Sequence, residues 1–192
     1  GFALYHQRVE NIVDMLLNIE LPQLRSVDIG NIRKIKALLA IISTEVPMLV
    51  DITKLATLTG IARTTILAYL QYLHEAKLIR LLYSDDLSVK KMQKPDKILM
   101  ENTNLLQALS LQVPNIGTMR ETFFCNQLGY THQVEYNKRG DYLIDHKYVF
   151  EIGGKAKDGK QVANMENAYI ASDECDYPIG NKLPLWLFGL MY

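Results

Sequence analysis

The stretch GDYLIDHKYVFEIGGKAK, residues 140–157, decides the fold of the second half of this 192-residue chain. Its two apolar triplets, YLI and YVF, flank the polar residues DHK. Short apolar runs on either side of a tight polar turn predict a β-hairpin. Asp141 opens the first predicted strand and Glu151 closes the second, so both carboxylates lie at the same open end of the hairpin. Two carboxylates at one strand end predict a site that can hold a divalent cation such as Mg²⁺.

Further elements are predicted on both sides of this hairpin. The pattern MRETFFCNQL predicts a helix over residues 119–128 that carries Glu121 near its start, where the helix dipole alone also favours an acid. The remaining predicted elements are a strand at 133–136, a helix at 160–167, a strand at 168–172 and an apolar final strand at 183–191 around Trp186. The predicted order is therefore helix, three strands, helix, strand, followed by the final strand.

This order and these acids resemble the core of the PD-(D/E)xK nucleases. The resemblance implies metal-dependent DNA cleavage, with Glu121, Asp141, Glu151 and Lys155 as catalytic residues and with Mg²⁺ bound by Asp141 and Glu151. The motif requires a lysine two positions after the second acid, where this chain has Gly153. Lys155 can replace that lysine only if the strand continues or the chain curls back; two successive glycines disfavour the first and allow the second. An active nuclease, a vestigial site with weak metal or nucleic-acid binding, and a purely structural domain all remain open.

A closer resemblance is to the C-terminal region of a bacterial AAA-type ATPase family. It rests on EIGGK after Gly140-Asp141 and on GNKLPLWLFG near the end, and it covers nearly the whole chain. In that family a winged helix precedes a nuclease-like domain of unknown function. The resemblance implies an N-terminal helix at 1–24 that ends the ATPase module, a winged helix at 25–110 and a nuclease-like domain at 111–192. ATP is then expected only in the missing N-terminal module, which is also the expected partner.

The first half of the chain predicts helices and a helix-turn-helix. Apolar spacing predicts one helix over 5–21, ended by Pro22, and another over 28–44 with Asp28 as its N-cap. From residue 51 the sequence DITKLATLTGIARTTILAYLQYLHEA predicts a short helix capped by Asp51, a turn at 59–61 and a longer helix at 62–76. Strands at 78–83 and 97–100 make a wing, and a short helix is predicted at 102–109.

Charge in this region favours a nucleic-acid surface. Residues 29–100 contain eleven Lys and Arg against six Asp and Glu, although the whole chain has 21 of each. The predicted contact residues lie at the start of the second helix and in the wing; they are Arg63, Thr64, Thr65, Lys90, Lys91 and Lys94. Two acids in the same wing, Asp85 and Asp86, argue against contact with DNA. Packing against another protein is the alternative use of a winged helix.

Other functional classes find little support in the sequence. Cys125 and Cys175 are the only cysteines, and the four histidines share no short spacing, so no zinc motif is predicted. No apolar run has the roughly 18 residues that a membrane span needs, and a cytoplasmic protein is expected. Residues 154–161 resemble the GxxxxGK part of a phosphate-binding loop, but Gln161 replaces the Ser or Thr that reaches Mg²⁺. The first residue is Gly, so a fragment of a longer protein is expected.

The sequence therefore predicts an α+β protein, with a winged helix-turn-helix domain followed by a small α/β restriction-endonuclease-like domain. The predicted function is an accessory region of an AAA-type ATP-binding protein, non-catalytic by itself, that binds DNA or the ATPase module. The alternatives are a metal-dependent DNA nuclease and a purely protein-interaction module. Self-association into a homo-oligomer is compatible with each of them.

Overall fold

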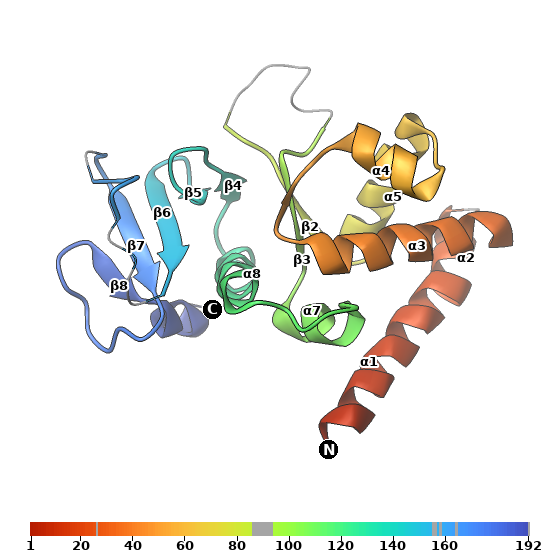
Figure 1. Cartoon of the computed structure of the whole chain (residues 1–192), viewed down its shortest axis with the longest axis horizontal. Coiled ribbons are helices and arrows are strands. Elements are labelled where there is room, and N and C mark those ends of the chain that lie inside the picture. Colours follow the sequence, from red (N-terminus) through yellow and green to blue (C-terminus); the bar gives the residue numbers. More distant parts are fainter. Residues whose placement is uncertain (26, 86–93, 155–156, 158, 164, 192) are drawn as a thin grey trace. The chain divides into compact units, whose positions relative to one another are not determined.

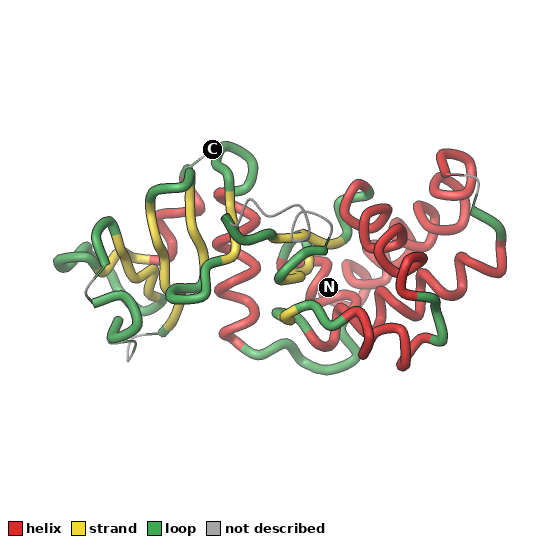
Figure 2. The backbone as a smooth tube through the Cα atoms, turned by 90° about the horizontal axis from the view of Figure 1, so that it is seen from above, coloured by secondary structure: helices red, strands yellow, loops and turns green. Residues whose placement is uncertain are grey.

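The computed structural model describes residues 1–25, 27–85, 94–154, 157, 159–163 and 165–191. It is a mixed α and β structure that divides into two compact units (Figure 1). The first unit comprises residues 1–81 and 98–114, and the second comprises residues 82–97 and 115–192. Residues 82–97 thus group with the second unit, whereas the sequence placed them in the first predicted domain. Helices make up most of the first unit, and the second contains the larger sheet (Figure 2).

The first unit consists of helices and a small sheet. Its N-terminal segment is α1 (Phe2–Met15), a π-helical stretch η1 (Leu16–Glu20) and α2 (Leu21–Arg25). The following elements are α3 (Ile29–Glu45), β1 (Met48–Leu49), α4 (Ile52–Thr59), α5 (Arg63–Glu75), β2 (Ile79–Leu82), β3 (Lys97–Met100) and α7 (Thr103–Leu109). The strands are ordered β1-β3-β2, so β3 is the central strand and pairs with both β1 and β2. The boundary between the two units falls within β2 and β3.

Side-chain caps define where the helices of the first unit begin. The Asp28 carboxylate accepts a hydrogen bond from the backbone N–H three residues later, and Asp51 accepts two from the first turn of α4. Gly60 ends α4 in the left-handed conformation, at φ 66°. The predicted core stripes of α3 and α5 are buried; they include Ile32, Ile35, Leu38, Leu39, Ile42, Ile66, Leu70 and Leu73. The predicted helices at 28–44, 51–58 and 62–76 are confirmed.

The N-terminal helix does not end at Pro22, as the sequence predicted. It continues to Arg25, with the π-helical stretch η1 directly before α2. Proline has no N–H to donate, and its ring clashes with the carbonyl four residues earlier. A π-helical turn widens the backbone at that point, so the chain can remain helical past the proline.

The second unit packs helix α8 against a five-stranded sheet. The elements are α8 (Ile116–Leu128), β4 (Val134–Tyr136), β5 (Tyr142–Ile144), β6 (Tyr148–Gly153), β7 (Ala168–Ser172), β8 (Lys182–Pro184) and the 3-10 helix η2 (Leu185–Leu190). The order is β4-β5-β6-β7-β8, antiparallel from β4 to β6 and parallel from β6 to β8. The predicted hairpin is confirmed, with its turn residues Asp145 and His146 at φ 52° and 56°. Glu151 lies inside β6 rather than at its end, because β6 continues to Gly153 in pairing with β7.

The two faces of this sheet have separate cores. Tyr142 and Phe150 pair across the hairpin and contact Phe124 of α8, with ring centroids 5.8 and 5.1 Å away. Phe188 of η2 completes this aromatic core, 4.8 Å from Phe124. The opposite face is covered by the connection between β6 and β7; its core residues are Leu143, Val149, Val162, Ala168 and Ile170. Because side chains alternate along a strand, Glu151 and Gly153 belong to the face of Val149.

Two predicted elements of the second unit are wrong. Described residues of the connection at 159–167 form successive turns rather than a helix. Each turn is closed by a hydrogen bond between residues three positions apart, for example from Val162 N–H to Gly159 O. This segment has few apolar positions to bury, and turns are enough to place Val162 in the core. The apolar C-terminus forms a 3-10 helix rather than a strand. Leu185 and Phe188, three residues apart, are buried together, whereas Trp186 is 54% exposed.

Candidate functional site

Helix α8 carries the first acid of the candidate site. Asn115 caps α8 by accepting a hydrogen bond from Thr118 N, so the helix begins three residues before the predicted start. Glu121 therefore lies in the second turn, and the helix dipole does not explain its presence there. Its Oε2 accepts hydrogen bonds from Lys97 Nζ at 2.6 Å and from the Tyr142 hydroxyl at 2.5 Å. Neither of these two donors was predicted from the sequence.

The hairpin brings the other two predicted acids together. Tyr142 pairs with Phe150, so the same register places Asp141 opposite Glu151. Asp141 donates its backbone N–H to Phe150 O, and its carboxylate accepts the N–H of Ile152 at 2.7 Å. Glu151 is only 2% exposed. The register therefore places the two residues opposite each other, and the cation site that they were predicted to form stays a prediction.

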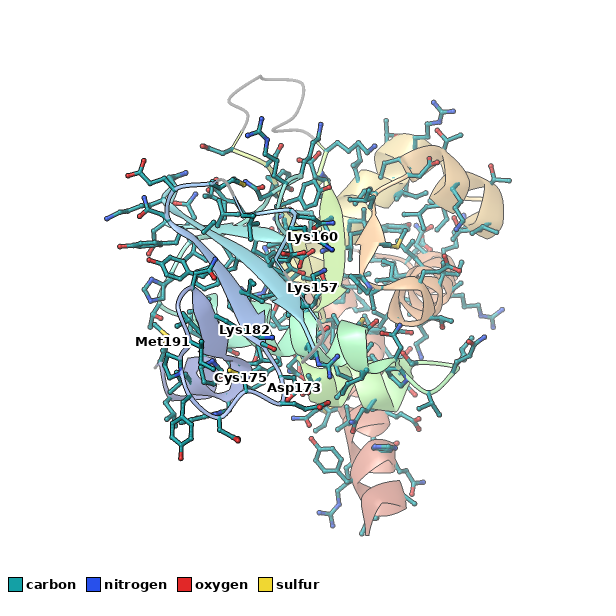
Figure 3. All side chains as sticks on the ribbon, turned by 60° about the vertical axis from the view of Figure 1, so that its left-hand side comes forward. Lys157, Lys160, Asp173, Cys175, Lys182 and Met191 are labelled. Carbon is teal, nitrogen blue, oxygen red and sulfur yellow. The ribbon has the colours of Figure 1, made fainter. Side chains whose placement is uncertain are left out.

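A lysine does lie beside Glu151, but it is Lys157. Its Nζ is 2.9 Å from Glu151 Oε1. A side chain at position 153 would need the same space, because a Cβ built on Gly153 meets the aliphatic carbons of Lys157 at 2.8 to 2.9 Å. Figure 3 labels Lys157 on the segment that follows β6. The ammonium beside Glu151 therefore belongs to Lys157, two positions after the lysine that the sequence predicted. Lys155 lies outside the described residues and stays a prediction.

Burial and charge shift the pKa values of this cluster. Burial raises the pKa of Asp141, although the N–H of Ile152 opposes this; the nearby Glu121 charge raises it further. Burial lowers the pKa of Lys157, but the hydrogen bond and the charge of Glu151 outweigh this effect, so the pKa is raised above its usual value. Burial also raises the pKa of the Tyr142 hydroxyl well above its usual value, so this group acts as a neutral donor. We define Glu121, Asp141, Glu151, Lys97 and Lys157 as the acid-lysine cluster.

The cluster fits a divalent cation only in part. Glu151 Oε2 is buried without a hydrogen-bond partner, which favours an ion at this point. However, Glu121 and Glu151 each already have a lysine ammonium as counter-ion. The three carboxylates also do not present three ligand atoms within 4.8 Å of one another, the spacing found in a different group of described residues. The lysines thus supply the positive charge that Mg²⁺ was predicted to supply.

Replacing Asp141 by asparagine is expected to stabilise the second unit at neutral pH. The folded-state pKa of Asp141 is raised, so the folded protein binds this proton more tightly than the unfolded chain does. Stability therefore falls as pH rises from about 4 through the folded pKa, and the cost persists above it. Asparagine does not ionise and can still accept the N–H of Ile152. Urea unfolding followed by the fluorescence of Trp186 should show a gain at pH 7 that shrinks toward pH 4.

The matched control for this prediction is Asp176→Asn. Asp176 is exposed in the loop after β7. Equal effects of the two substitutions on the pH profile would contradict a special role of the buried Asp141.

The predicted nucleic-acid residues of the first unit lie at the start of α5. Arg63 and Thr64 are exposed, and Thr65 is half-buried. Ala62, the N-cap of α5, provides no side-chain cap to the first backbone N–H groups. In the part of the chain that the structure describes, Arg63 makes no ion pair. The prediction for these three residues remains a prediction.

The predicted wing residues are described only in part. Lys94 is exposed before β3 and groups with the second unit. Lys90 and Lys91 lie outside the described residues, as does Asp86. The near-match to a phosphate-binding loop falls mostly on positions outside the described residues as well.

Three residues of the site were not predicted from the sequence. Lys97 and Tyr142 were treated as strand residues, although a lysine beginning the apolar run KILM is a signal of a buried ion pair. Lys157 was passed over because Lys155 is nearer to the motif position. Arg80 and Glu101 of the first unit form a further buried ion pair, 2.5 Å between Nη2 and Oε1. An arginine within LIRLL was the available signal for that pair.

The fold and the cluster define a mixed α+β protein whose second unit holds buried acids paired with lysines. The chain belongs to the family described as a domain of unknown function (DUF8612), whose profile matches residues 3–115. The acids Glu121, Asp141 and Glu151 all lie beyond the matched range. No curated protein and no solved structure matches the chain. Among the described residues, no helix has the length and apolar character needed to cross a membrane.

Proposed function

We propose that this chain is an accessory region of an AAA-type ATPase, in which a winged helix binds nucleic acid or the ATPase module. The second unit is then a PD-(D/E)xK-like domain that is non-catalytic by itself. The observation that carries the nucleic-acid part is the start of α5, where Arg63 and Thr64 are exposed and no side chain caps the first backbone N–H groups. A helix start of this kind is what a recognition helix presents to bases and phosphates.

The order of elements in the first unit supports a winged helix. Helix α3 is followed by the short strand β1, then by α4 and α5, and then by the strand pair β2 and β3. The sheet order β1-β3-β2 has the short strand beside the second strand of the pair. A sharp turn at Gly60 joins α4 to α5, as in a helix-turn-helix.

The second unit supports both parts of the proposal for this domain, namely that it is nuclease-like in its order of elements and that it has no catalytic activity by itself. An acid on a helix, a hairpin with Asp141 opposite Glu151 and a parallel strand after it agree with the predicted order, except that turns replace the helix predicted before the parallel strand. A buried carboxylate that already has an ammonium partner is a poor ligand for a further cation, because the pair must first be separated. The lysine partners of Glu121 and Glu151 therefore support a scaffold role.

DNA binding by this protein is expected to weaken steeply with salt. Each phosphate contact made by a lysine or arginine contributes a slope of about −0.9 in log K against log salt. Arg63→Ala should therefore reduce the slope by about one unit and lower the affinity for DNA of any sequence. Fluorescence anisotropy with a labelled duplex, measured over a range of salt concentrations, gives both quantities. Lys34→Ala is the matched control, since it removes an exposed cation from α3.

The outcomes separate the two partners in the proposal. A slope that Arg63→Ala and Lys34→Ala change equally would show that α5 has no special part in binding. Binding that is independent of salt, or absent even at low salt, contradicts the nucleic-acid branch and leaves the ATPase module as the partner. In that case the full-length protein and this chain should be compared for ATPase activity.

A metal-dependent nuclease is the second candidate function. It is favoured by one observation, namely that Lys157 restores in space the lysine missing at Gly153. The binding reactions should be repeated with supercoiled plasmid and Mn²⁺, so that nicking is seen beside retardation. Nicking that disappears in Asp141→Ala would support the nuclease, whereas nicking that persists in this variant points to a contaminant.

A further inference from the structure

Three side chains from separate segments of the second unit converge outside the acid-lysine cluster. Asp85 follows β2, Glu135 lies in β4, and His146 lies in the turn between β5 and β6. His146 Nδ1 is 2.9 Å from Glu135 Oε2 and 3.2 Å from Asp85 Oδ1. One ligand atom from each residue lies within 4.8 Å of the other two.

The backbone holds Asp85 beside β4. Ser84 forms a parallel bridge with Tyr136, whose N–H donates to Tyr83 O at 2.9 Å. The Asp96 carboxylate accepts both the backbone N–H and the hydroxyl of Ser84, each at 2.8 Å. Asp85 thus directly follows Ser84, which is held by β4 on one side and by Asp96 on the other. Its place near Glu135 follows from strand pairing and not from the chance position of a loose loop.

The hairpin turn fixes His146 in the same way. Asp145 and His146 both have positive φ, as a two-residue turn between twisted strands requires. Asp145 donates its N–H to Gln133 O, and its carboxylate accepts the N–H of Gln133 at 2.9 Å. The turn is therefore tied to the start of β4, two residues before Glu135.

Glu135 supplies an independent sign of a missing partner. The residue is 9% exposed, and the side-chain amide of Gln133 donates to its Oε1 at 3.3 Å. Its Oε2 is buried and is counted in no hydrogen bond, and its one close polar neighbour is His146 Nδ1 at 2.9 Å among the described residues. A cation between the three side chains would satisfy Oε2.

We propose that Asp85, Glu135 and His146 form a binding site for a divalent transition-metal ion. Two carboxylate oxygens and one imidazole nitrogen suit Zn²⁺, Mn²⁺ or Co²⁺ better than Ca²⁺ or Mg²⁺, which prefer oxygen ligands only. Ligands about 2.1 Å from a tetrahedral Zn²⁺ lie about 3.4 Å from one another. The spacings of 2.9 and 3.2 Å require only small shifts to reach this value. Asp85 and His146 are half exposed, so the ion keeps positions open to water.

The test uses Zn²⁺ and Co²⁺ as probes on the whole chain after removal of metal with a chelator. One equivalent of Zn²⁺ is expected to bind, measured by competition with a chelating dye. Loss of a direct ligand in His146→Ala or Glu135→Gln should weaken binding by at least about 10-fold, the lower end of what outer partners of a metal site contribute. Co²⁺ should give a visible absorption band that His146→Ala removes.

His132→Ala is the matched control. His132 lies beside the same turn but pairs with Asp145, at 2.7 Å, and is not part of the group. It should retain wild-type affinity for Zn²⁺ and the Co²⁺ band. Circular dichroism must show that each variant is folded, and Asp85→Asn, an exposed substitution, gives a second variant if Glu135→Gln is not. Absence of saturable binding, or equal binding in wild type and His146→Ala, would overturn the proposal.

Discussion

Replacing Arg80 by methionine is expected to destabilise the first unit by about 3–5 kcal/mol, the usual cost of breaking a buried ion pair. Arg80 of β2 and Glu101 after β3 are both buried, with 10% and 3% of their side chains exposed. Without Arg80, the Glu101 carboxylate remains in the core with no counter-ion. Thermal and urea unfolding followed by far-UV circular dichroism, which reports mainly the helices of this unit, should measure the loss.

The double variant Arg80→Met, Glu101→Leu should recover most of this stability. Arg80 Nε and Glu101 Oε2 are buried without hydrogen-bond partners, so the pair is only partly compensated for its lost hydration. Replacing both partners with apolar side chains is therefore expected to be near neutral. Arg63→Met, at an exposed position, controls for the loss of one positive charge. A single Arg80→Met that is no less stable than Arg63→Met would show that the pair contributes nothing.

Local signals explain which elements the sequence predicted well. Asp28 and Asp51 each stand one residue before an apolar helical pattern, and each caps a helix as expected. The hairpin turn at Asp145 was equally clear, because its residues and the apolar runs beside it agree. In these cases one short stretch contains both the residue that marks the boundary of the element and the apolar pattern of the element. The element can therefore be predicted without knowledge of a distant contact.

The wrong elements are those whose form depends on distant packing. Pro22 ends a helix in isolation, but here the chain stays helical to Arg25, with a π-helical stretch directly before the proline's own helix. The apolar run at 183–191 is compatible with a strand or a helix. Packing of Phe188 on Phe124 of α8 favours the 3-10 helix. Nothing within the run itself indicates this contact. Spacing along the chain could not reveal it.

The same limit applies to both candidate sites. Lys97 reaches Glu121, 24 residues away, only because the two residues fold into one unit. The residues Asp85, Glu135 and His146 lie up to 61 residues apart in the sequence and share no motif. The carboxylates Asp141 and Glu151 were predictable because a hairpin places them opposite each other. Contacts between residues far apart in the sequence can be recognised only from the fold, whereas contacts between neighbours in a hairpin can be predicted from the sequence pattern.

Moving the lysine from position 157 to position 153 is expected to preserve the second unit, although each half of the change damages it. Lys157→Ala leaves Glu151 buried without its ammonium. The expected loss is about 2–3 kcal/mol, less than for a fully buried pair because the Lys157 side chain is 35% exposed and water screens it. Gly153→Lys alone should also destabilise, since its Cβ would lie 2.8 Å from Lys157 carbons.

The double variant Gly153→Lys, Lys157→Ala places the ammonium on the same face as Glu151, two residues along β6. It also removes the Cγ and Cδ of Lys157, two of the three carbons closest to a Cβ at position 153, and leaves only the Cβ of residue 157 at 2.9 Å, so the two changes should compensate each other in large part. Unfolding followed by Trp186 fluorescence should give a coupling energy of more than about 1 kcal/mol, beyond the error of additivity. Gly180→Lys, at an open loop position, controls for the added lysine only if the strain of its positive φ is subtracted with Gly180→Ala.

Simple additivity of the two single variants would show that Lys157 does not occupy the place of the motif lysine. Strong coupling would show that position 153 and Lys157 are two routes to one ammonium beside Glu151. The plasmid assay then separates the remaining functions, because a scaffold needs this charge only for stability. A nuclease needs it beside the scissile phosphate as well, so nicking should then be lost in Lys157→Ala under conditions where that variant is still folded.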